Sequence, residues 1–390
     1  MRKFIIVVIC LLFTSINIFE IAFAKELKKS ETQEKEYIIS YENSVEEDLI
    51  KEVGGKSIKS FKYSPAVTAS LTKQQVNKLM KNKMIVDVEQ NEKVYAAENE
   101  DNMGNYPMNN VTYPSWNLKQ TRINKVLNKG IRGGDIKVGV IDSGISTSHF
   151  DLKVEGGVNI LDSAGSYDDD YGHGTRVAGI IAALDNDIGV KGVAPDAELY
   201  SIKVLDSKGE GMISDIISGI EWAIENDIDI INLSVQTTIE NKLLKKTINQ
   251  AIKQGVIIVA AAGNKGYSET ESTITYPANY QSVISVGALT KKKLRADFSS
   301  IGENLDLMAP GEYVYTTFGK GYFVAFSGTS IATPHVTGTA ALMLSVNQSL
   351  TQSQIKKILK KSATPLGEER LYGAGELNAN KAIKKTEKIN

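Results

Sequence analysis

Short runs of continuous apolar residues constrain the fold of this 390-residue chain more than any other feature. One of them is Val256-Ile257-Ile258-Val259, and a run of this kind predicts a strand that is buried on both faces. Segments with helical periodicity separate the runs, which indicates a parallel twisted sheet flanked by helices, an α/β fold. The expected strands are residues 136–141, 198–204, 228–233, 256–261 and 283–286, and the expected helices are 174–183, 214–226, 242–254 and 331–344.

The first 24 residues have the composition of a secretory signal peptide. Arg2 and Lys3 provide positive charge, residues 4–13 are apolar, and Ala22-Phe23-Ala24 supplies the small residues at which such peptides are cleaved. A transmembrane anchor is the alternative, but the apolar stretch is shorter than the span of about 20 residues that a membrane requires. We therefore expect secretion, with no membrane attachment after processing.

Cysteine content and charge exclude several classes of protein. The one cysteine, Cys10, lies in the expected signal peptide, so the processed protein would have neither a disulfide nor a cysteine nucleophile. The formal net charge is −1, and no long segment carries a single sign of charge. We therefore expect neither nucleic acid nor an anionic membrane as a partner.

The remaining sequence divides into a small domain, a linker and a large domain. Residues 25–97 alternate between strand-like and helix-like stretches, with a capping box at Thr72 and Gln75, and predict a small α+β domain. Residues 98–112 are polar and rich in asparagine, which is typical of an exposed linker that is open to proteolysis. Residues 113–390 contain the expected parallel sheet.

Asp142 and His173 lie in two glycine-rich motifs at the ends of predicted elements. Asp142 ends a strand and is followed by Ser143-Gly144, whereas His173 lies between two glycines where a helix begins. A carboxylate at a buried strand end orients an imidazole and stabilises its charged form. Each motif alone also has a structural interpretation, as a turn or as a structural histidine. The only other histidines are His149 and His335.

Ser330 and Asn264 complete the set of groups that hydrolysis of a peptide bond requires. Ser330 lies in Ser327-Gly328-Thr329-Ser330, and Pro334 is expected in the first turn of the following helix. A hydroxyl at a helix N-terminus lies where free N–H groups favour negative charge. Asn264 follows a buried strand, so its amide is a candidate oxyanion donor beside the Ser330 N–H. An N-cap serine and a turn asparagine are the structural alternatives.

The order Asp142, His173, Asn264, Ser330 resembles that of the subtilisin-type serine proteases. The resemblance extends from about Trp116 to the C-terminus, and residues 37–96 resemble the inhibitory propeptide of the family. It implies a secreted serine endopeptidase with a subtilisin-like fold. It also implies that residues 25–97 form a ferredoxin-like propeptide, which assists folding, blocks the cleft and is removed by cleavage in the linker, residues 98–112.

The resemblance also implies a catalytic role for each of the four residues. His173 takes the proton of Ser330 as the hydroxyl attacks the scissile carbonyl, and Asp142 orients His173. Asn264 and the Ser330 N–H hold the oxyanion. An acyl-enzyme forms, and water releases it.

Substrates of the family pair as an added strand between two chain segments, which makes recognition largely main-chain. Thr275 and Gln236 stand where relatives commonly have glycine, and Thr275 would make the S1 pocket shallow. We therefore expect small, polar or acidic residues before the scissile bond (P1) to be favoured over large aromatic or basic ones. The matching residues are Gly209, Glu210, Gly211, Ser234, Val235 and Gln236 for pairing, Ile213 and Val235 for the S4 pocket, and Ala261, Ala262, Gly263, Lys265 and Thr275 for the S1 pocket.

Calcium is the cofactor that the resemblance implies. Asp151, nine residues after Asp142, matches a ligand of the family, and a following loop matches the segment that supplies the others. Three of the loop residues would bind through backbone carbonyls, which suits a cation that prefers oxygen ligands. The alternative is that residues 185–187 form only a polar turn. The matching loop residues are Leu184, Asn186, Ile188 and Val190.

The sequence leaves two alternatives open. A catalytically silent scaffold would bind peptides without cutting them, although the four intact residues favour an enzyme. A broad scavenging protease competes with a dedicated enzyme that processes one precursor. The expected partners are protein or peptide substrates and the chain's own propeptide, and we expect a monomer.

Overall fold

The computed structural model describes residues 31–97, 99–107 and 112–389, with the side chains of 99–107 excepted. The chain divides into two units, Met1–Asn91 and Glu92–Asn390. The expected signal peptide, residues 1–24, lies outside the described residues. Among the described residues, no helix combines the length and the apolar character that a membrane crossing requires.

The first unit contains a four-stranded antiparallel sheet in the order β2-β3-β1-β4. The expected capping box is present, because Thr72 N donates to Gln75 Oε1 at 2.7 Å and Gln75 N donates to Thr72 Oγ1 at 3.3 Å. The sequence does not predict β2, because Ile58 is its one apolar residue and gives no apolar alternation. In the structure Ile58 is 51% exposed. The elements are β1 (Lys35–Tyr41), α2 (Glu47–Glu52), β2 (Lys56–Ser60), β3 (Ala66–Leu71), α3 (Lys73–Leu79) and β4 (Ile85–Gln90).

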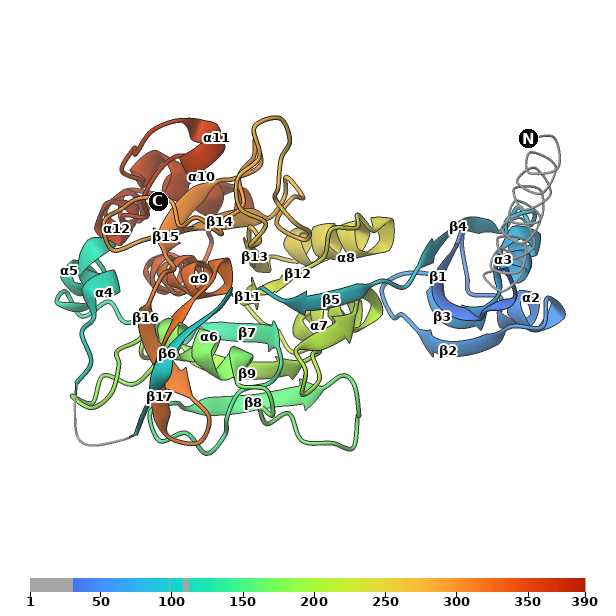
Figure 1. Cartoon of the computed structure of the whole chain (residues 1–390), viewed down its shortest axis with the longest axis horizontal. Helices are drawn as coiled ribbons and strands as arrows, with labels where there is room; N and C mark the ends of the chain where they lie inside the picture. Colours follow the sequence, from blue (N-terminus) through green and yellow to red (C-terminus); the bar gives the residue numbers. More distant parts are fainter. Residues whose placement is uncertain (1–30, 98, 108–111, 390) are drawn as a thin grey trace, which may run out of the picture. The chain divides into compact units, whose positions relative to one another are not determined.

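The second unit is built on a seven-stranded sheet in the order β15-β14-β13-β11-β7-β9-β8. All neighbouring strands in it are parallel, which confirms the expected α/β fold. Helices α6 and α9 pack together, as do α7 and α8, and each pair contacts the sheet (Figure 1). The elements are β7 (Lys137–Asp142), β8 (Val154–Asn159), α6 (His173–Ala182), β9 (Glu198–Lys203), α7 (Ile213–Glu225), β11 (Ile230–Leu233), α8 (Lys242–Lys253), β13 (Ile257–Ala261), β14 (Ile284–Leu289), β15 (Leu307–Pro310) and α9 (Thr329–Val346).

All five strands and four helices that the sequence predicts are present, with ends shifted by no more than three residues. The sequence does not predict β8, because Gly156 and Gly157 interrupt any apolar run there. It also does not predict two strands of three and two residues, β10 (Glu210–Met212) and β12 (Val235–Gln236). These short strands matter for the site, because each pairs with β5 (Lys93–Ala96).

Helix α9 begins earlier than expected and contains Pro334 in its interior. The prediction that Pro334 lies in the first helical turn is therefore wrong. A proline has no N–H to donate to the carbonyl four residues before it, which here is the carbonyl of Ser330. Ser234 Oγ donates to that carbonyl instead, at 3.2 Å. Because of the proline, the Ser330 carbonyl is free to accept from Ser234, and this bond joins the first turn of α9 to the residue after β11.

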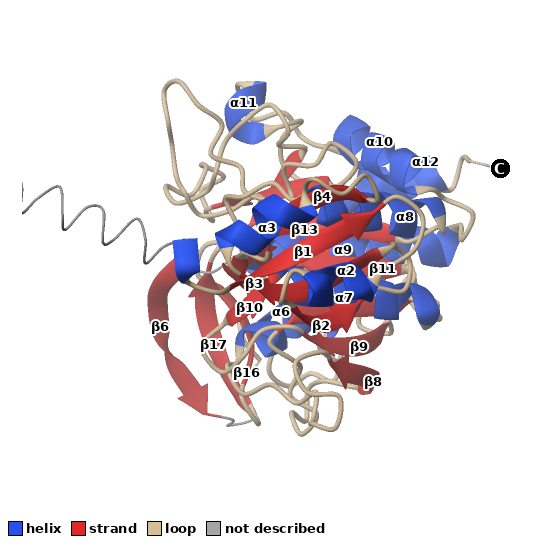
Figure 2. Cartoon of the chain, turned by 90° about the vertical axis from the view of Figure 1, so that its right-hand side faces the viewer, coloured by secondary structure: helices blue, strands red, loops and turns tan. Residues whose placement is uncertain are grey.

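A second antiparallel sheet contains part of the expected linker. Strand β6 (Asn99–Pro107) pairs with β17 (Tyr322–Ser327), which pairs with β16 (Val314–Phe318), and the three lie side by side in Figure 2. Residues 98–112 are expected to form an exposed linker, but 99–107 are a strand. Their polar sequence lacks the apolar alternation by which a strand is predicted, and the pairing with β17 supplies the order instead.

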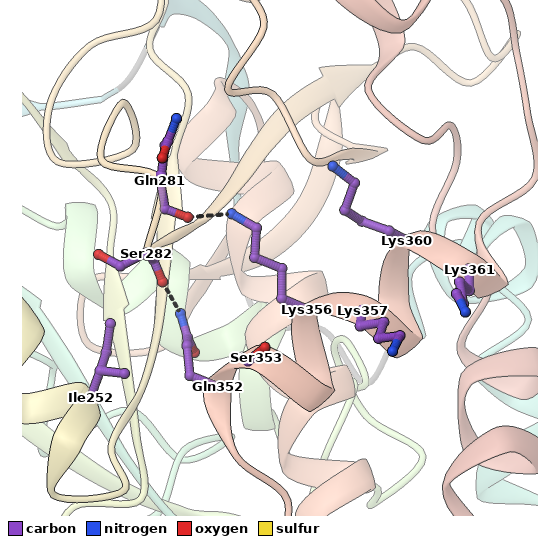
Figure 3. A pocket seen from close by; sticks show the side chains of 9 residues that line it. All are labelled: Ile252, Gln281, Ser282, Gln352, Ser353, Lys356, Lys357, Lys360 and Lys361. Atoms are coloured by element: carbon purple, nitrogen blue, oxygen red, sulfur yellow. Dashed lines mark hydrogen bonds between the residues drawn. The ribbon is translucent and has the colours of Figure 1, made fainter.

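Helix α10 (Gln352–Ser362) is joined to the sheet through polar side chains. Gln352 Nε2 donates to Ser282 O at 2.8 Å, and Lys356 Nζ donates to Gln281 O at 2.8 Å (Figure 3). These bonds line a cavity of about 600 Å³. Because the polar residues around this cavity hold α10 in place, we assign them a structural role. The remaining helices are α4 (Trp116–Gln120), α5 (Asn124–Leu127), α11 (Glu369–Tyr372) and α12 (Ala379–Thr386).

His335 is a fully buried histidine within α9. Its Nδ1 lies 3.0 Å from Ile331 O and its Nε2 lies 2.9 Å from Asn117 Nδ2, so the ring donates through Nδ1 and accepts through Nε2. Burial lowers the pKa of His335 to about 4. In the unfolded chain the pKa of a histidine is about 6.5. The unfolded chain therefore binds a proton between these two pH values that the folded chain excludes.

We predict that this histidine makes the protein less stable as the pH falls. Its contribution is fully present above pH ~6.5 and decreases toward pH ~4, by up to about 3 kcal/mol of unfolding free energy. His335→Gln cannot take up a proton and should flatten this dependence. The melting temperatures of both proteins at acid and neutral pH test this, with Ser330→Ala in each to prevent the expected self-cleavage. Equal pH dependence in the two proteins would contradict it.

Candidate active site

Three of the expected site residues lie at the same edge of the parallel sheet. Strand β7 ends at Asp142, Ser234 follows β11, and Asn264 comes three residues after β13. The three strands are parallel neighbours in the order β13-β11-β7, so their carboxyl ends meet at one edge. The topology therefore gathers residues that are far apart in the sequence.

Asp142 and His173 form a buried hydrogen-bonded pair. His173 Nδ1 lies 2.7 Å from Asp142 Oδ1 and 2.9 Å from Oδ2, and neither residue has exposed surface. Ser143 N donates to Asp142 Oδ1 at 2.7 Å. Because the hydrogen on Nδ1 is directed at the carboxylate, Nε2 is the ring nitrogen that can accept a proton in a reaction.

The structure distinguishes His173 from the other two histidines. His149 Nε2 lies 3.0 Å from Tyr322 O, and its Nδ1 accepts from Asp151 N at 3.2 Å. His335 is enclosed within α9. Of the three histidines, which all lie in the described part of the chain, only His173 pairs with a carboxylate side chain, which makes it the candidate base.

Asp169 holds the start of helix α6, where His173 lies. Its Oδ1 accepts from Gly172 N at 2.7 Å and its Oδ2 from Thr175 N at 2.9 Å, so the carboxylate satisfies N–H groups of the first turn. A Cβ on Gly174 would lie 2.0 Å from a backbone oxygen of the loop after β7. Glycine at this position therefore permits the close approach of α6 to the strand that ends at the carboxylate.

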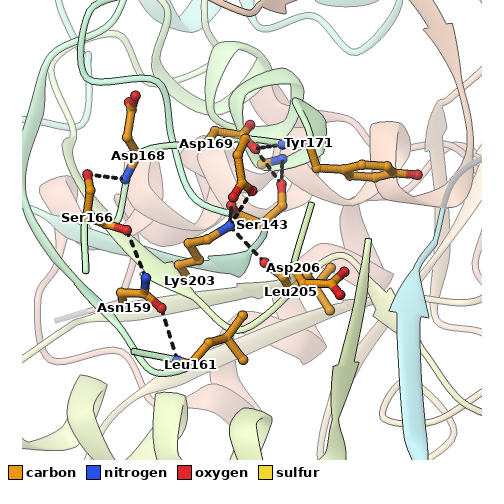
Figure 4. Close-up of polar contacts among 12 residues, drawn as sticks. Ser143, Asn159, Leu161, Ser166, Asp168, Asp169, Tyr171, Lys203, Leu205 and Asp206 are labelled. Atoms are coloured by element: carbon orange, nitrogen blue, oxygen red, sulfur yellow. Dashed lines mark hydrogen bonds and ion pairs between the residues drawn. The ribbon is translucent and has the colours of Figure 1, made fainter. Parts of the chain in front are cut away.

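Lys203 is a buried lysine at the end of β9, where it is the partner of Asp142 in the sheet. Its Nζ donates to Ser143 O at 2.6 Å and to Leu205 O at 2.9 Å (Figure 4). It also pairs with Asp170 at 2.6 Å. Ser143 Oγ donates in turn to Asp169 Oδ1 at 2.8 Å. The loop after Asp142 is thereby fixed to β9 and to the start of α6.

Ser330 is the second residue of α9 and has no exposed surface. Its N–H donates to Ala97 O at 3.2 Å, and its carbonyl accepts from Ser234 Oγ. Its Oγ is buried and makes no hydrogen bond to any described residue. The backbone of Ser330 is thus held on both sides, while its hydroxyl keeps its capacity to donate and to accept.

Asn264 is oriented by the residue that precedes Ser330. Asn264 Oδ1 accepts from Thr329 N at 3.0 Å and from Thr329 Oγ1 at 2.9 Å. A backbone N–H requires an acceptor, so this contact fixes which end of the amide is the oxygen. Nδ2 is buried and has no partner within the described part of the chain. Two N–H donors, Asn264 Nδ2 and Ser330 N, therefore come from residues that are both held at the first turn of α9.

The chain's own residues 93–97 lie against the segments expected to bind substrate. Strand β5 lies between β10 and β12 and is antiparallel to both. Beyond its end, Ala97 N donates to Ser234 O at 2.9 Å and Ala97 O accepts from Ser330 N. An extended segment therefore leads to Ser330 and presents a peptide carbonyl to it.

The expected S1 residues lie close together. A Cβ on Gly263 would meet Thr275 Oγ1 at 2.4 Å, and Gln236 Oε1 accepts from Asn264 N at 3.3 Å. Thr275 is buried whereas Lys265 is exposed. A cavity of about 480 Å³ has Gln236, Lys265, Thr275 and Tyr95 in its lining. The other expected binding residues lie in or next to β10, β12 and β13, or at the start of α7. The ones with no exposed surface are Ile213, Val235, Ala261 and Ala262.

The expected calcium residues surround Asp151, which is fully buried. Asp151 Oδ1 accepts from Asn186 Nδ2 at 3.0 Å, Oδ2 accepts from Val190 N at 3.4 Å, and Asp151 O accepts from Leu184 N at 3.0 Å. Ile188 N donates to Asn186 Oδ1 at 3.0 Å, which closes the loop. Burial raises the pKa of the Asp151 carboxyl to about 7. No three His, Cys, Asp or Glu side chains of the described residues could hold a metal ion, so a cation here would need carbonyl ligands.

Several residues of the site are not singled out by the sequence motifs. Asp169 lies in an acidic run just before a helix, which is a general signal for an N-cap. Lys203 lies between the apolar residues Ile202 and Val204 at the end of a predicted strand, which is the one signal that it is buried. Thr329 gives no signal of its own, because its contact with Asn264 depends on the packing of distant segments.

Comparisons with known proteins identify the family of the chain. The model of the subtilase family (Peptidase S8) matches residues 133–375. Subtilisin NAT of Bacillus subtilis subsp. natto is 42% identical over 386 residues, which cover 96% of this chain and 98% of that protein. Subtilisin DY of Bacillus licheniformis is 48% identical over 261 residues, 67% of this chain and 95% of that protein. Minor extracellular protease Epr of Bacillus subtilis is 35% identical over 367 residues, 93% of this chain and 55% of that protein.

The matched family segment contains the parallel sheet and the four residues Asp142, His173, Asn264 and Ser330. Identity to Subtilisin NAT extends over nearly the whole of both chains, including the N-terminal unit. The chain therefore belongs to the subtilase family and is a serine endopeptidase with an α/β subtilisin-like fold.

Proposed function

We propose that the chain is the precursor of a secreted endopeptidase with Ser330 as nucleophile, His173 as base and Asp142 as the residue that orients the base. One observation carries the proposal: the Ser330 N–H donates to Ala97 O at 3.2 Å, at the end of a segment that pairs as a strand. A donor in this position polarises the carbonyl next to the hydroxyl that would attack it. Residues 93–97 thus have the position of a substrate.

In the proposed reaction, His173 Nε2 takes the proton of Ser330 as Oγ attacks the carbonyl carbon of the P1 residue. Asp142 keeps the Nδ1 hydrogen directed at itself and stabilises the imidazolium. Negative charge develops on the carbonyl oxygen, where the Ser330 N–H and Asn264 Nδ2 would donate to it. His173 then protonates the leaving amine, and water attacks the acyl-enzyme by the same steps in the second half of the reaction.

We propose that residues 25–97 act as a propeptide, cut from the enzyme after Ala97. The antiparallel pairing of β5 with β10 and β12 supports this, because a product strand that keeps these bonds would block the cleft after cleavage. Subtilisin DY also supports it, because about a third of this chain has no counterpart in that protein. Extracellular location is proposed from the signal-like N-terminus and from the name of the Epr relative.

The chain's own sequence supports a preference for small P1 residues. Ala97, the residue before the proposed scissile bond, is fully buried, and Thr275 fills space next to Gly263. Val94, four residues before the proposed scissile bond, is 2% exposed, as an apolar S4 residue would be. Because the rest of the contact is main-chain pairing, we propose a broad range of protein substrates. A precursor cut after Lys93 or Tyr95 would contradict the small P1 preference.

We predict that Asn264→Ala lowers kcat strongly with little change in KM. The expected loss is about 10²–10³, the size of the loss found for the corresponding donor in subtilisin. The reason is that Asn264 Nδ2 would bond the oxyanion, which exists only after attack. Steady-state kinetics with a peptide that ends in Ala at P1 measure both constants.

The control is Asn249→Ala, on helix α8, which contributes no residue to the site. It should leave both constants within about twofold of the wild type, because surface substitutions of this kind have small effects. An Asn264→Ala enzyme with the wild-type kcat, or one with only KM changed, would contradict the assignment of Asn264.

We propose calcium as a ligand of the loop around Asp151. The Asp151 carboxylate is buried, and an amide oxygen and backbone carbonyls of residues 184–190 lie in the same loop, which suits a hard cation that takes oxygen ligands. The ion would supply the positive charge that offsets the burial of Asp151 and would link this loop to the segment after β7. Asp151, Asn186 and the carbonyls of Leu184, Ile188 and Val190 are the residues that would hold it.

We predict that calcium raises the melting temperature of the wild type by about 5–10 °C when it is present at about 100 times its dissociation constant. Asp151→Asn removes the charge and should abolish this shift. Asp187→Asn should keep it, because Asp187 lies in the same loop but outside the proposed ligand set. Differential scanning calorimetry with and without a chelator, in a Ser330→Ala background, measures the shift without reference to activity. Equal melting temperatures of the wild type in both conditions would exclude the site.

A further inference from the structure

Arg176 is a buried cation in helix α6, the helix that begins with His173. It is 5% exposed and lies one helical turn after His173 in α6. Its guanidinium carbon is 4.0 Å from the centre of the Phe326 ring and 5.6 Å from the centre of the Phe318 ring. Arginine remains charged at any ordinary pH, and its planar group can stack on an aromatic face while its N–H groups form hydrogen bonds at the edge.

The packing of α6 on strand β16 fixes the position of this arginine. Thr316 Oγ1 donates to Arg176 O at 2.5 Å, and Thr317 Oγ1 donates to Thr175 O at 2.7 Å. A Cβ on Gly179 would lie 2.2 Å from Thr317 Oγ1, so glycine permits this close contact. These contacts fix the backbone of Arg176 against β16, the strand that also carries Phe318.

The backbone register places the residues after the proposed scissile bond beside this arginine. Phe326 is in β17, which pairs with β6, the strand that begins two residues after Ala97. Ser327 is opposite Asn99 and Ala325 is opposite Met103, with an irregularity between them. Residues 100–102 are therefore the part of β6 that passes Phe326.

The sequence that follows Ala97 is acidic. The four residues after Ala97 are Glu98, Asn99, Glu100 and Asp101, three of which carry a carboxylate. A buried guanidinium is costly unless an anion offsets its loss of hydration, and a carboxylate matches its edge with two parallel hydrogen bonds. The charge of Arg176 and the charge of this segment are thus complementary.

We propose that Arg176, stacked on Phe326, forms a binding subsite for a substrate carboxylate on the leaving-group side of the scissile bond, within four residues of it (P1′ to P4′). The subsite rests on the proposed function, because it defines the substrate of that same cleft. It makes the enzyme select peptides with Glu or Asp after the cleaved bond. The acidic segment 98–101 is then the first substrate to use it, during processing of the precursor.

Two fluorogenic nonapeptides test the subsite with the processed wild-type enzyme. One is Lys-Val-Tyr-Ala-Ala-Glu-Asn-Glu-Asp, and the other is Lys-Val-Tyr-Ala-Ala-Gln-Asn-Gln-Asn, which keeps its shape without the charge. We expect kcat/KM to be about tenfold higher for the acidic peptide, the usual size of one charge-assisted hydrogen bond. Arg176→Gln should lower kcat/KM for the acidic peptide and leave that for the neutral peptide unchanged. The ratio of the two values should then be about one. Lys320→Gln, an exposed change in the β16–β17 turn, controls for general charge and should keep the ratio.

Each outcome decides a separate point. Equal cleavage of both peptides by the wild type would overturn the subsite and leave the proposed function intact, and this result needs no variant that folds. An Arg176→Gln enzyme that loses activity equally on both peptides would show that Arg176 serves structure, which also overturns the subsite. Failure of the wild type to cleave either peptide would overturn the proposed function and the subsite with it.

Discussion

The buried hydrogen bond between His173 and Asp142 is the interaction on which the rest of the site depends. Its two members come from different elements, the end of β7 and the start of α6, so it holds only if the sheet and the helix keep one relative position. A buried carboxylate is favourable only with hydrogen bonds that offset its lost hydration, and Asp142 accepts from Ser143 N as well as from the His173 ring. Asp169 and Lys203 both bond to Ser143, and they thereby fix the loop after Asp142 to the start of α6 and to β9.

Helix α9 makes the second half of the site depend on the same sheet edge. Pro334 leaves the carbonyl of Ser330 without a helical partner, and Ser234 donates to it from the end of β11. Thr329 orients the amide of Asn264, which comes from the loop after β13. The first turn of α9 is therefore positioned by two neighbouring strands, and a shift of either one would move the hydroxyl and the N–H donors together.

The sequence predicts the residues whose signals are local, and fails where the signal is a contact between distant segments. The α/β fold and the four motif residues follow from apolar runs and glycine-rich turns. The interior position of Pro334 does not follow from such local signals, because the bond between Thr329 and Asn264 sets where α9 begins. Strand β6 does not follow from them either, because its sequence is polar and its pairing with β17 supplies the order. The sequence likewise does not single out Arg176, because its contact with Phe326 joins segments that are far apart in the chain.

In the proposed function the chain is its own first substrate, with the carbonyl of Ala97 presented to Ser330. The most direct test is to produce the full chain and its Ser330→Ala variant, and to determine the N-terminus and intact mass of each secreted product. The wild-type product should begin at Glu98. In the Ser330→Ala variant, residues 97 and 98 should remain joined. The same cleavage in both proteins, or a wild-type terminus at another bond, would contradict the proposed function.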